Sequence, residues 1–146
     1  MIGLTAGDNS RKLSEDELIR YGQELAENLS PGSVVALYGD LGSGKTTLAA
    51  AIAAGLGVAE RVTSPTFTII GEYVSGHLPL YHFDVYRLGS AAAEEMEELG
   101  YLEYFAGEGV SIVEWADLIE ELLPPHTMRI YLDYADEGQT RMLSLK

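Results

Sequence analysis

The segment GDLGSGKTT, residues 39–47, limits the folds open to this chain more than any other feature. It matches the pattern G-x-x-x-x-G-K-[ST] and lies between an apolar, β-branched run, residues 33–38, and an alanine-rich run, residues 45–57. The first run is typical of a buried strand and the second of a helix. This strand–loop–helix unit predicts an α/β domain in which backbone N–H groups of the loop surround phosphate.

The residues expected to bind a phosphate chain are consecutive: Gly39, Asp40, Leu41, Gly42, Ser43, Gly44, Lys45, Thr46 and Thr47. Lys45 is expected to reach the β- and γ-phosphates and so to take part in catalysis, and the Thr46 hydroxyl to ligate Mg²⁺. The strings N-K-x-D and D-x-x-G of guanine-specific proteins do not occur in the sequence. We therefore expect ATP to be the nucleotide.

Helix and strand patterns continue along the chain. The sequence predicts helices over 14–29, 91–105 and 116–123, and strands over 66–74, 80–88, 110–115, 128–134 and 140–146. Ser14 and Glu17 form a capping-box pattern at the start of the first helix. The short link between the strands 66–74 and 80–88 favours a hairpin. We predict one domain over residues 1–146, a three-layer P-loop NTPase-like α/β fold with a mixed parallel/antiparallel sheet, and expect residues 1–12 to be disordered.

The charge of the chain limits its partners. It has 23 acidic and 9 basic residues, a formal net charge of −14, whereas a basic stripe is the usual mark of a protein that holds nucleic acid. The acidity alone would favour solubility. No run approaches the roughly 20 apolar residues of a membrane span, and the N-terminus lacks the pattern of a signal peptide. We expect a cytoplasmic protein that contacts no membrane and meets nucleic acid only through a partner.

Two carboxylates in predicted strands are candidates for metal binding and catalysis. Glu114 ends an apolar run, which is the position of a second magnesium ligand beside a phosphate loop. Asp84 lies inside an otherwise apolar strand, where a buried carboxylate needs a cation or a donor. An ion pair with Arg87 or an outward-facing side chain is the alternative for Asp84. We assign His82 to packing, with a role in the site as the alternative, and Trp115 either to the core or to a contact surface.

Four strings together resemble the TsaE family, the small bacterial P-loop ATPases of tRNA threonylcarbamoyladenosine synthesis: GDLGSGKTT, VTSPTFTII, LYHFDVYRL and VEWAD. The resemblance extends from about residue 13 to the C-terminus. It implies ATP hydrolysis with Mg²⁺, weak in the isolated protein, and action with the TsaD and TsaB proteins that transfer the threonylcarbamoyl group. By motif, it implies that Lys45 and Thr46 bind the nucleotide, that Glu114 is the second magnesium ligand, and that Asp84 is a catalytic candidate.

The resemblance also implies switch segments that face the partners. It places a switch-like loop near the γ-phosphate and a second one around Asp84, and the switch or partner candidates are Ser64, Pro65, Thr66, Phe67, Arg87 and Trp115. One departure is Ala116, where a proline or glycine often follows the E-W pair. The partners would then hold the tRNA, in agreement with the acidity of this chain.

Two other functions are compatible with the loop. A small-molecule or nucleotide kinase uses the same loop but needs several arginines around the acceptor, and the middle of this chain offers Arg61 and Arg87. A nucleotide-dependent binding switch would turn over little ATP. The products distinguish the three functions: free phosphate, a phosphorylated acceptor, or neither.

Overall fold

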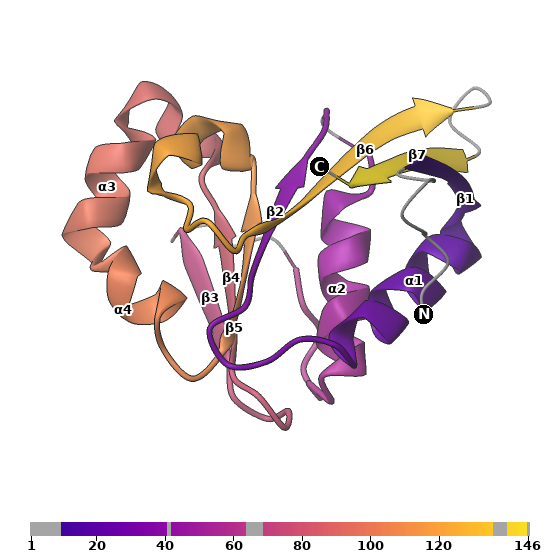
Figure 1. Cartoon of the computed structure of the whole chain (residues 1–146), viewed down its shortest axis with the longest axis horizontal. Helices are drawn as coiled ribbons and strands as arrows, with labels where there is room; N and C mark the ends of the chain where they lie inside the picture. The colour runs from indigo at the N-terminus through magenta and orange to yellow at the C-terminus, as the bar shows by residue number, and fades with distance from the viewer. Residues whose placement is uncertain (1–9, 41, 64–68, 136–139, 146) are drawn as a thin grey trace.

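The computed structural model describes residues 10–40, 42–63, 69–135 and 140–145. In these residues seven strands form one sheet in the order β1–β7–β6–β2–β5–β4–β3 (Figure 1). The strands are β1 (Ser10–Ser14), β2 (Val34–Tyr38), β3 (Ile70–Tyr73), β4 (Leu80–Asp84), β5 (Val110–Glu114), β6 (Met128–Ala135) and β7 (Thr140–Leu145). β6, β2, β5 and β4 are parallel, while β3, β7 and β1 pair antiparallel with their neighbours. The predicted mixed sheet is confirmed.

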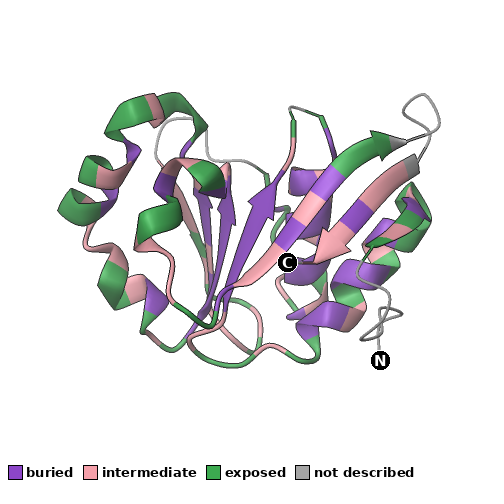
Figure 2. Ribbon diagram, turned by 45° about the horizontal axis from the view of Figure 1, so that its top comes forward, coloured by how far each residue is buried: buried purple, intermediate pink, exposed green. Residues whose placement is uncertain are grey.

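Helices on both faces of the sheet give three layers (Figure 1). One face is covered by α1 (Glu15–Ala26) and α2 (Lys45–Gly55), and the other by α3 (Ala92–Leu99), α4 (Tyr101–Phe105) and the 3-10 segments η1 (Tyr86–Ala91) and η2 (Ala116–Leu122). Every residue of β2 and β5 is buried, as Figure 2 shows for the centre of the sheet. Two apolar cores therefore form, one on each side of these strands.

The parallel strands bring chemically important residues to one edge of the sheet. β2 lies between β6 and β5, and the glycine-rich loop begins at its carboxyl end. Asp84 ends β4 and Glu114 ends β5, and the two residues are partners in the register. Parallel strands end at the same edge, so both carboxylates lie on the side of the sheet where the loop leaves β2.

Glycines allow α1 and α2 to approach closely. A Cβ atom added to Gly22 of α1 would lie 2.6 Å from the Cβ atom of Ala51, and one added to Gly55 of α2 would lie 2.6 Å from that of Ala26. Real Cβ atoms do not approach to this distance, so neither position accepts a side chain without movement. This contact keeps the start of α1 beside the glycine-rich loop.

The predicted elements are found with differences. The helix predicted over 91–105 is divided at Gly100 into α3 and α4, and the helix predicted over 116–123 is the 3-10 segment η2. α1 begins at the predicted capping box, where the Ser14 N–H donates to Glu17 Oε1 over 2.9 Å, but it ends at Ala26 rather than at residue 29. The strand predicted over 80–88 ends at Asp84 and continues as η1.

The expectation of disorder is wrong for residues 10–12. They belong to β1, which pairs with β7. Leu13 is the buried residue of this strand and its neighbours are polar, so the alternation is too short to indicate a strand in the sequence. Within the described residues, no helix has the length and hydropathy needed to cross a membrane.

Candidate functional site

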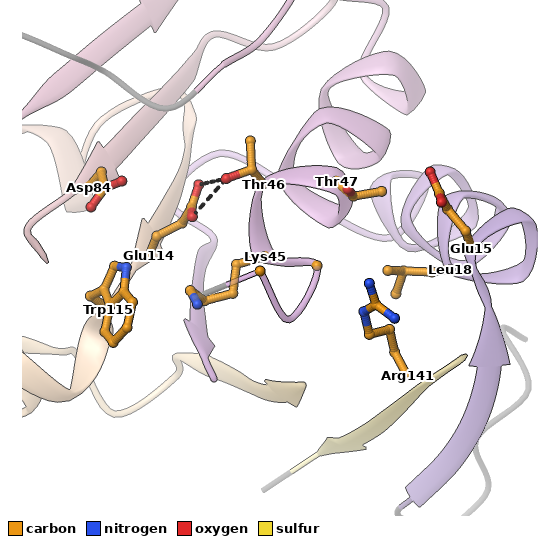
Figure 3. A pocket seen from close by; sticks show the side chains of 11 residues that line it. Glu15, Leu18, Lys45, Thr46, Thr47, Asp84, Glu114, Trp115 and Arg141 are labelled. Carbon is orange, nitrogen blue, oxygen red and sulfur yellow. Dashed lines mark hydrogen bonds between the residues drawn. The ribbon is translucent and has the colours of Figure 1, made fainter. Parts of the chain in front are cut away.

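A cavity of about 210 Å³ opens over the glycine-rich loop (Figure 3). Its floor is the loop and the start of α2, contributing Gly42, Gly44, Lys45, Thr46 and Thr47. The ends of β4 and β5 supply Asp84, Glu114 and Trp115 at one end of the cavity, and α1 and β7 supply Glu15, Leu18 and Arg141 at the other. The cavity therefore unites the predicted loop with both predicted carboxylates.

The loop holds a backbone conformation that requires glycine. Gly39 has φ 145° and Gly44 has φ 108°, values that side-chain-bearing residues rarely adopt. A Cβ atom at Gly39 would also collide with the carbonyl oxygen of Leu132 on β6. Gly44 is the N-cap residue of α2, so the helix begins directly under the cavity. The positive end of a helix at this point favours an anion.

Lys45 lies folded against the loop that precedes it. Its side chain is buried, and Nζ donates to the carbonyl oxygens of Gly39 and Asp40 over 2.6 and 2.8 Å, and to the hydroxyl of Ser43 over 3.4 Å. The ammonium group thus lies against the inner side of the loop, where loop carbonyls satisfy it. A phosphate group that enters the loop can replace these carbonyls as acceptor, because a charged acceptor binds an ammonium group more strongly.

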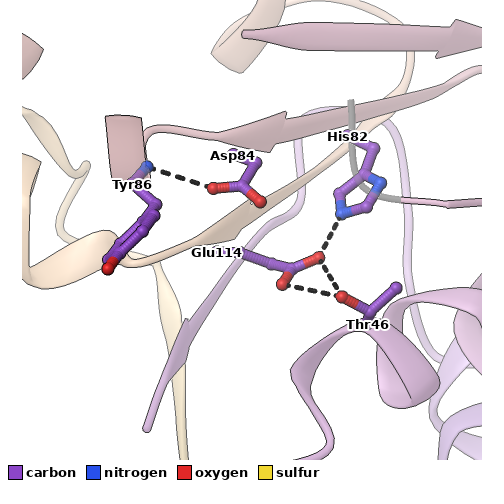
Figure 4. A network of polar contacts seen from close by, with 5 residues as sticks. All are labelled: Thr46, His82, Asp84, Tyr86 and Glu114. Carbon is purple, nitrogen blue, oxygen red and sulfur yellow. Dashed lines mark hydrogen bonds and ion pairs between the residues drawn. The ribbon is translucent and has the colours of Figure 1, made fainter. Parts of the chain in front are cut away.

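Glu114 connects three elements through its carboxylate (Figure 4). The hydroxyl of Thr46 at the start of α2 donates to both carboxylate oxygens, over 3.0 and 3.1 Å. His82 Nε2 lies 2.6 Å from Oε2, and the side chains of His82 and Glu114 are 0 and 3% exposed. Since a carboxylate can only accept, the imidazole donates at Nε2. These bonds fix the orientation of Glu114 toward α2.

Asp84 faces the cavity rather than the solvent side of the sheet. It lies two residues after His82, so both side chains project from the same face of β4. Asp84 Oδ1 accepts a hydrogen bond from the backbone N–H of Tyr86 over 3.0 Å, and the side chain is half-buried. Burial lowers the pKa of Lys45, and the carboxylates of Glu114 and Asp84 act in the opposite direction.

The oxygen donors at this end of the cavity suit Mg²⁺. The Thr46 hydroxyl and the Glu114 carboxylate are within hydrogen-bonding distance of each other, and Asp84 is the register partner of Glu114. In the described part of the chain, no group of three or more acidic or histidine residues could bind a metal ion by itself. Mg²⁺ commonly takes one or two protein ligands and completes its shell with phosphates and water. Thr46 and Glu114 could hold such an ion together with a nucleotide.

Trp115 covers the cavity next to the lysine. Its ring centroid lies 4.3 Å from Lys45 Nζ and 4.6 Å from the ring centroid of Tyr86. Its φ of 61° is a positive value for a residue with a side chain, which holds the ring at this place at some cost in backbone strain. Tyr86 is 51% exposed and Arg87 beside it on η1 is exposed as well. Trp115 therefore joins the cavity to the outer surface of η1.

Several predicted site residues lie outside the described residues. These are Leu41 of the loop and the proposed switch residues Ser64, Pro65, Thr66 and Phe67. Of the other loop residues, Gly42, Gly44, Lys45, Thr46 and Thr47 line the cavity together with Asp84 and Glu114, and the binding roles assigned to them stay predictions.

Four residues of the site are not predicted from the sequence: Glu15 and Leu18 of α1, His82 and Arg141. His82, assigned to packing, is bonded to Glu114, and its spacing from Asp84 on one strand face was the signal that could have indicated this. Arg141 lines the cavity from β7, although 94 residues separate it from Thr47 on the opposite wall. Its position follows from strand pairing, which no local pattern in the sequence predicts.

A glycine-rich loop between a central parallel strand and a helix, with acids at the ends of neighbouring strands, defines a P-loop NTPase-like domain. A family model described as "Threonylcarbamoyl adenosine biosynthesis protein TsaE" matches residues 13–143. This chain belongs to the TsaE family.

Curated relatives support the same assignment. The chain is 47% identical to the tRNA threonylcarbamoyladenosine biosynthesis protein TsaE of Bacillus subtilis over 88% of this chain and 79% of that protein. It is 41% identical to the protein of the same name from Treponema pallidum, over 86% of this chain and 90% of that one. The crystal structure of Bacillus subtilis YdiB superposes with a TM-score of 0.76 at 41% identity, covering 93% of this chain and 82% of that chain.

Removing the imidazole tests whether it holds Glu114 in place. His82→Ala is expected to lower the free energy of unfolding by about 3 kcal/mol, because it leaves a cavity and removes a hydrogen bond to a buried carboxylate. His82→Gln retains an N–H donor and is expected to recover part of this loss. Urea unfolding followed by circular dichroism measures both. The matched control is His77→Ala at an exposed position, expected to stay within about 0.5 kcal/mol of the wild type. Equal changes in the free energy of unfolding for His82→Ala and His77→Ala would contradict the proposal that His82 holds Glu114 in place.

Proposed function

We propose that this protein binds ATP with Mg²⁺, hydrolyses it, and thereby supports tRNA threonylcarbamoyladenosine formation together with the TsaD and TsaB proteins. The observation that carries the proposal is the meeting of Lys45, Thr46 and Glu114 at the start of α2. Membership of the TsaE family supports the pathway. Because tRNA is the final substrate, the same proposal includes action in the cytoplasm.

In this proposal the loop binds the phosphate chain. The N–H groups between Gly39 and Thr47 and the N-terminus of α2 surround the phosphates. Lys45 exchanges its loop carbonyls for oxygens of the β- and γ-phosphates. Thr46 and Glu114, which hydrogen-bond to each other, would hold Mg²⁺, and the ion would supply positive charge to neutralise charge that develops on the phosphates.

Asp84 is proposed to orient the attacking water. It lies beside Glu114 at the end of the cavity where the terminal phosphate would lie, and a carboxylate there can accept a hydrogen bond from water. The backbone N–H of Tyr86 holds one of its oxygens and leaves the other for this role. His82 keeps Glu114 turned toward the metal position and does not contact the nucleotide.

The charge around the cavity favours hydrolysis over transfer to a phosphorylated acceptor. A kinase that acts on such an acceptor must neutralise its phosphate next to the γ-phosphate. At this end the described residues that line the cavity are Asp84, Glu114 and Trp115, with Lys45 at the loop. Two carboxylates repel a phosphorylated acceptor, whereas they suit a neutral water molecule.

Hydrolysis tests the proposal directly. Lys45→Ala is expected to abolish ATP binding, and Asp84→Asn to lower kcat by roughly a hundredfold while changing the Kd for ATP by less than about threefold. Calorimetry measures binding, and chromatography separates ADP, free phosphate and any phosphorylated product. Lys12→Ala on β1, outside the cavity, is the matched control. A wild-type rate in Lys45→Ala would refute the loop assignment, and a phosphorylated acceptor in place of free phosphate would establish a kinase.

Partner binding tests the pathway. A net charge of −14 repels tRNA, so we expect negligible tRNA binding by the isolated chain at physiological salt. We expect a TsaD–TsaB assembly to bind the chain more tightly with an ATP analogue than with ADP, because a ligand shifts a conformational equilibrium only through different affinities for its states. Titration calorimetry measures the affinity of the assembly for the chain in the presence of the ATP analogue, with ADP, and without nucleotide. Equal affinities in all three would contradict a nucleotide-controlled partner interaction.

A further inference from the structure

Trp115 holds a strained backbone conformation next to the lysine of the loop. Among the described residues it is the only one other than glycine with a positive φ, 61°. A residue in this conformation keeps it only where the surrounding structure imposes it. Its ring centroid lies 4.3 Å from Lys45 Nζ (Figure 3), and the chain continues from Trp115 directly into η2. The contacts that fix η2 therefore also fix the ring over Lys45.

Backbone hydrogen bonds alone do not make η2 rigid. It is a 3-10 segment of seven residues, and Ile119 within it has the non-helical angles φ −131° and ψ 30°. Segments of this kind are short and have poor hydrogen-bond geometry. Ala116 and Ile119 pack in the core on this face of the sheet. Glu120, the next residue, adds polar contacts with the sheet.

Two strands hold the Glu120 carboxylate, each at one oxygen. The Tyr38 hydroxyl at the end of β2 donates to Oε1 over 2.5 Å. Arg129 of β6 donates to Oε2 from Nε and Nη2, over 2.9 and 2.6 Å. Tyr131, the register partner of Tyr38, stacks on its ring with the centroids 4.3 Å apart. Burial raises the pKa of Tyr38 and the Glu120 carboxylate raises it further, so the phenol keeps the proton that it donates.

The contact with Tyr38 makes this group more than an exposed ion pair. Arg129 and Glu120, with side chains 26 and 46% exposed, would contribute little as an isolated pair. Tyr38 is 5% exposed, and a charged acceptor strengthens the hydrogen bond that its hydroxyl donates. Tyr38 is also the residue directly before Gly39, where the glycine-rich loop begins. Glu120 is therefore bonded to the residue from which the loop starts.

These contacts form a closed path around the loop. Lys45 Nζ donates to the carbonyl oxygen of Gly39 over 2.6 Å, and Gly39 follows Tyr38 in the chain. Lys45 lies against the Trp115 ring, from which η2 begins. Glu120 of η2 returns the path to Tyr38. The loop and η2 thus meet at two points, the lysine and the carboxylate.

We propose that Glu120 is a positioning residue: Tyr38 and Arg129 hold it so that η2 keeps the Trp115 ring over Lys45. Glu120 is not among the described residues that line the cavity, so it acts through the ring. The ring keeps water from one side of the ammonium group, and a drier surrounding strengthens the attraction of this group for phosphate. That consequence rests on the proposed function, because it assumes that phosphates meet Lys45. The position of the ring does not depend on it.

The test uses the fluorescence of Trp115, the single tryptophan of the chain. Acrylamide quenching without nucleotide measures how open the ring is to solvent. Glu120→Ala is expected to raise the Stern–Volmer constant about twofold, and Tyr38→Phe, which keeps the stacked ring and removes the hydroxyl, by a smaller amount. Glu121→Ala, at the next, exposed position of η2 and with the same loss of charge, is the matched control and is expected to equal the wild type. Circular dichroism checks that each variant is folded.

Calorimetry with ATP measures the consequence for the cavity. Glu120→Ala is expected to raise the Kd for ATP with Mg²⁺ about fivefold, because the lysine loses the ring that shields it. The ratio of the Kd values without and with Mg²⁺ is expected to stay within about twofold of the wild-type ratio. Thr46 and His82 hold Glu114 without help from η2, so the proposed metal ligands keep their places.

The outcomes separate this proposal from the proposed function. Increased quenching in Glu120→Ala and Tyr38→Phe, with the Mg²⁺ ratio retained, supports the positioning role. Wild-type quenching in both variants, or an equal increase in Glu121→Ala, would overturn it. An increase in Glu120→Ala with none in Tyr38→Phe would also overturn it, because the contact with the start of the loop would then have no effect on the ring. Failure of the wild type to bind ATP would overturn the proposed function alone, since the quenching measurement needs no nucleotide.

Discussion

The hydrogen bonds to the Glu114 carboxylate organise the rest of the site. They join the end of β5 to the start of α2 through Thr46 and to β4 through His82, at distances of 2.6 to 3.1 Å. A buried carboxylate is costly unless donors surround it, so these contacts also fix how the strands and helix meet. The same arrangement holds the oxygen atoms of Thr46 and Glu114 next to each other at the start of α2. Stability and the proposed metal binding would thus depend on one set of atoms, and a nucleotide with Mg²⁺ would replace the threonine bond while leaving the histidine bond.

The site also explains how a chain of net charge −14 could hold a polyanion. The attraction would come from short-range sources: loop N–H groups, the N-terminus of α2, Lys45 and Arg141. Beyond the cavity, the acidic surface repels nucleic acid over the Debye length. A protein of this kind can bind a nucleotide without binding tRNA, which agrees with a role beside tRNA-binding partners. The exposed ring of Tyr86 contacts Trp115, and Trp115 in turn lies over Lys45. A partner protein that contacts Tyr86 could therefore respond to a nucleotide bound beside Lys45.

The sequence predicts the parts of this site that are local in the chain. The loop, its strand and helix, and Glu114 follow from a motif and a short apolar run, and strand alternation could have assigned His82 and Asp84 to one face. Arg141 could not be found in this way, because its position depends on β7 pairing with β6 and on β6 lying beside β2. β1 was not predicted for a similar reason. A segment with one buried leucine among polar residues forms a strand only because the edge strand β7 is there to pair with it. The pairing of distant strands, rather than local pattern, decides these positions.

The most direct test of the central claim is the position of a metal ion. A crystal structure with Mn²⁺ and a non-hydrolysable ATP analogue, with anomalous scattering recorded for manganese, locates it without assumption. We predict one manganese peak at about 2.1 Å from both Thr46 Oγ1 and a Glu114 carboxylate oxygen, with His82 Nε2 still bonded to the other oxygen of Glu114. A metal ion bound away from Thr46 and Glu114, or a phosphate chain outside the glycine-rich loop, would contradict it.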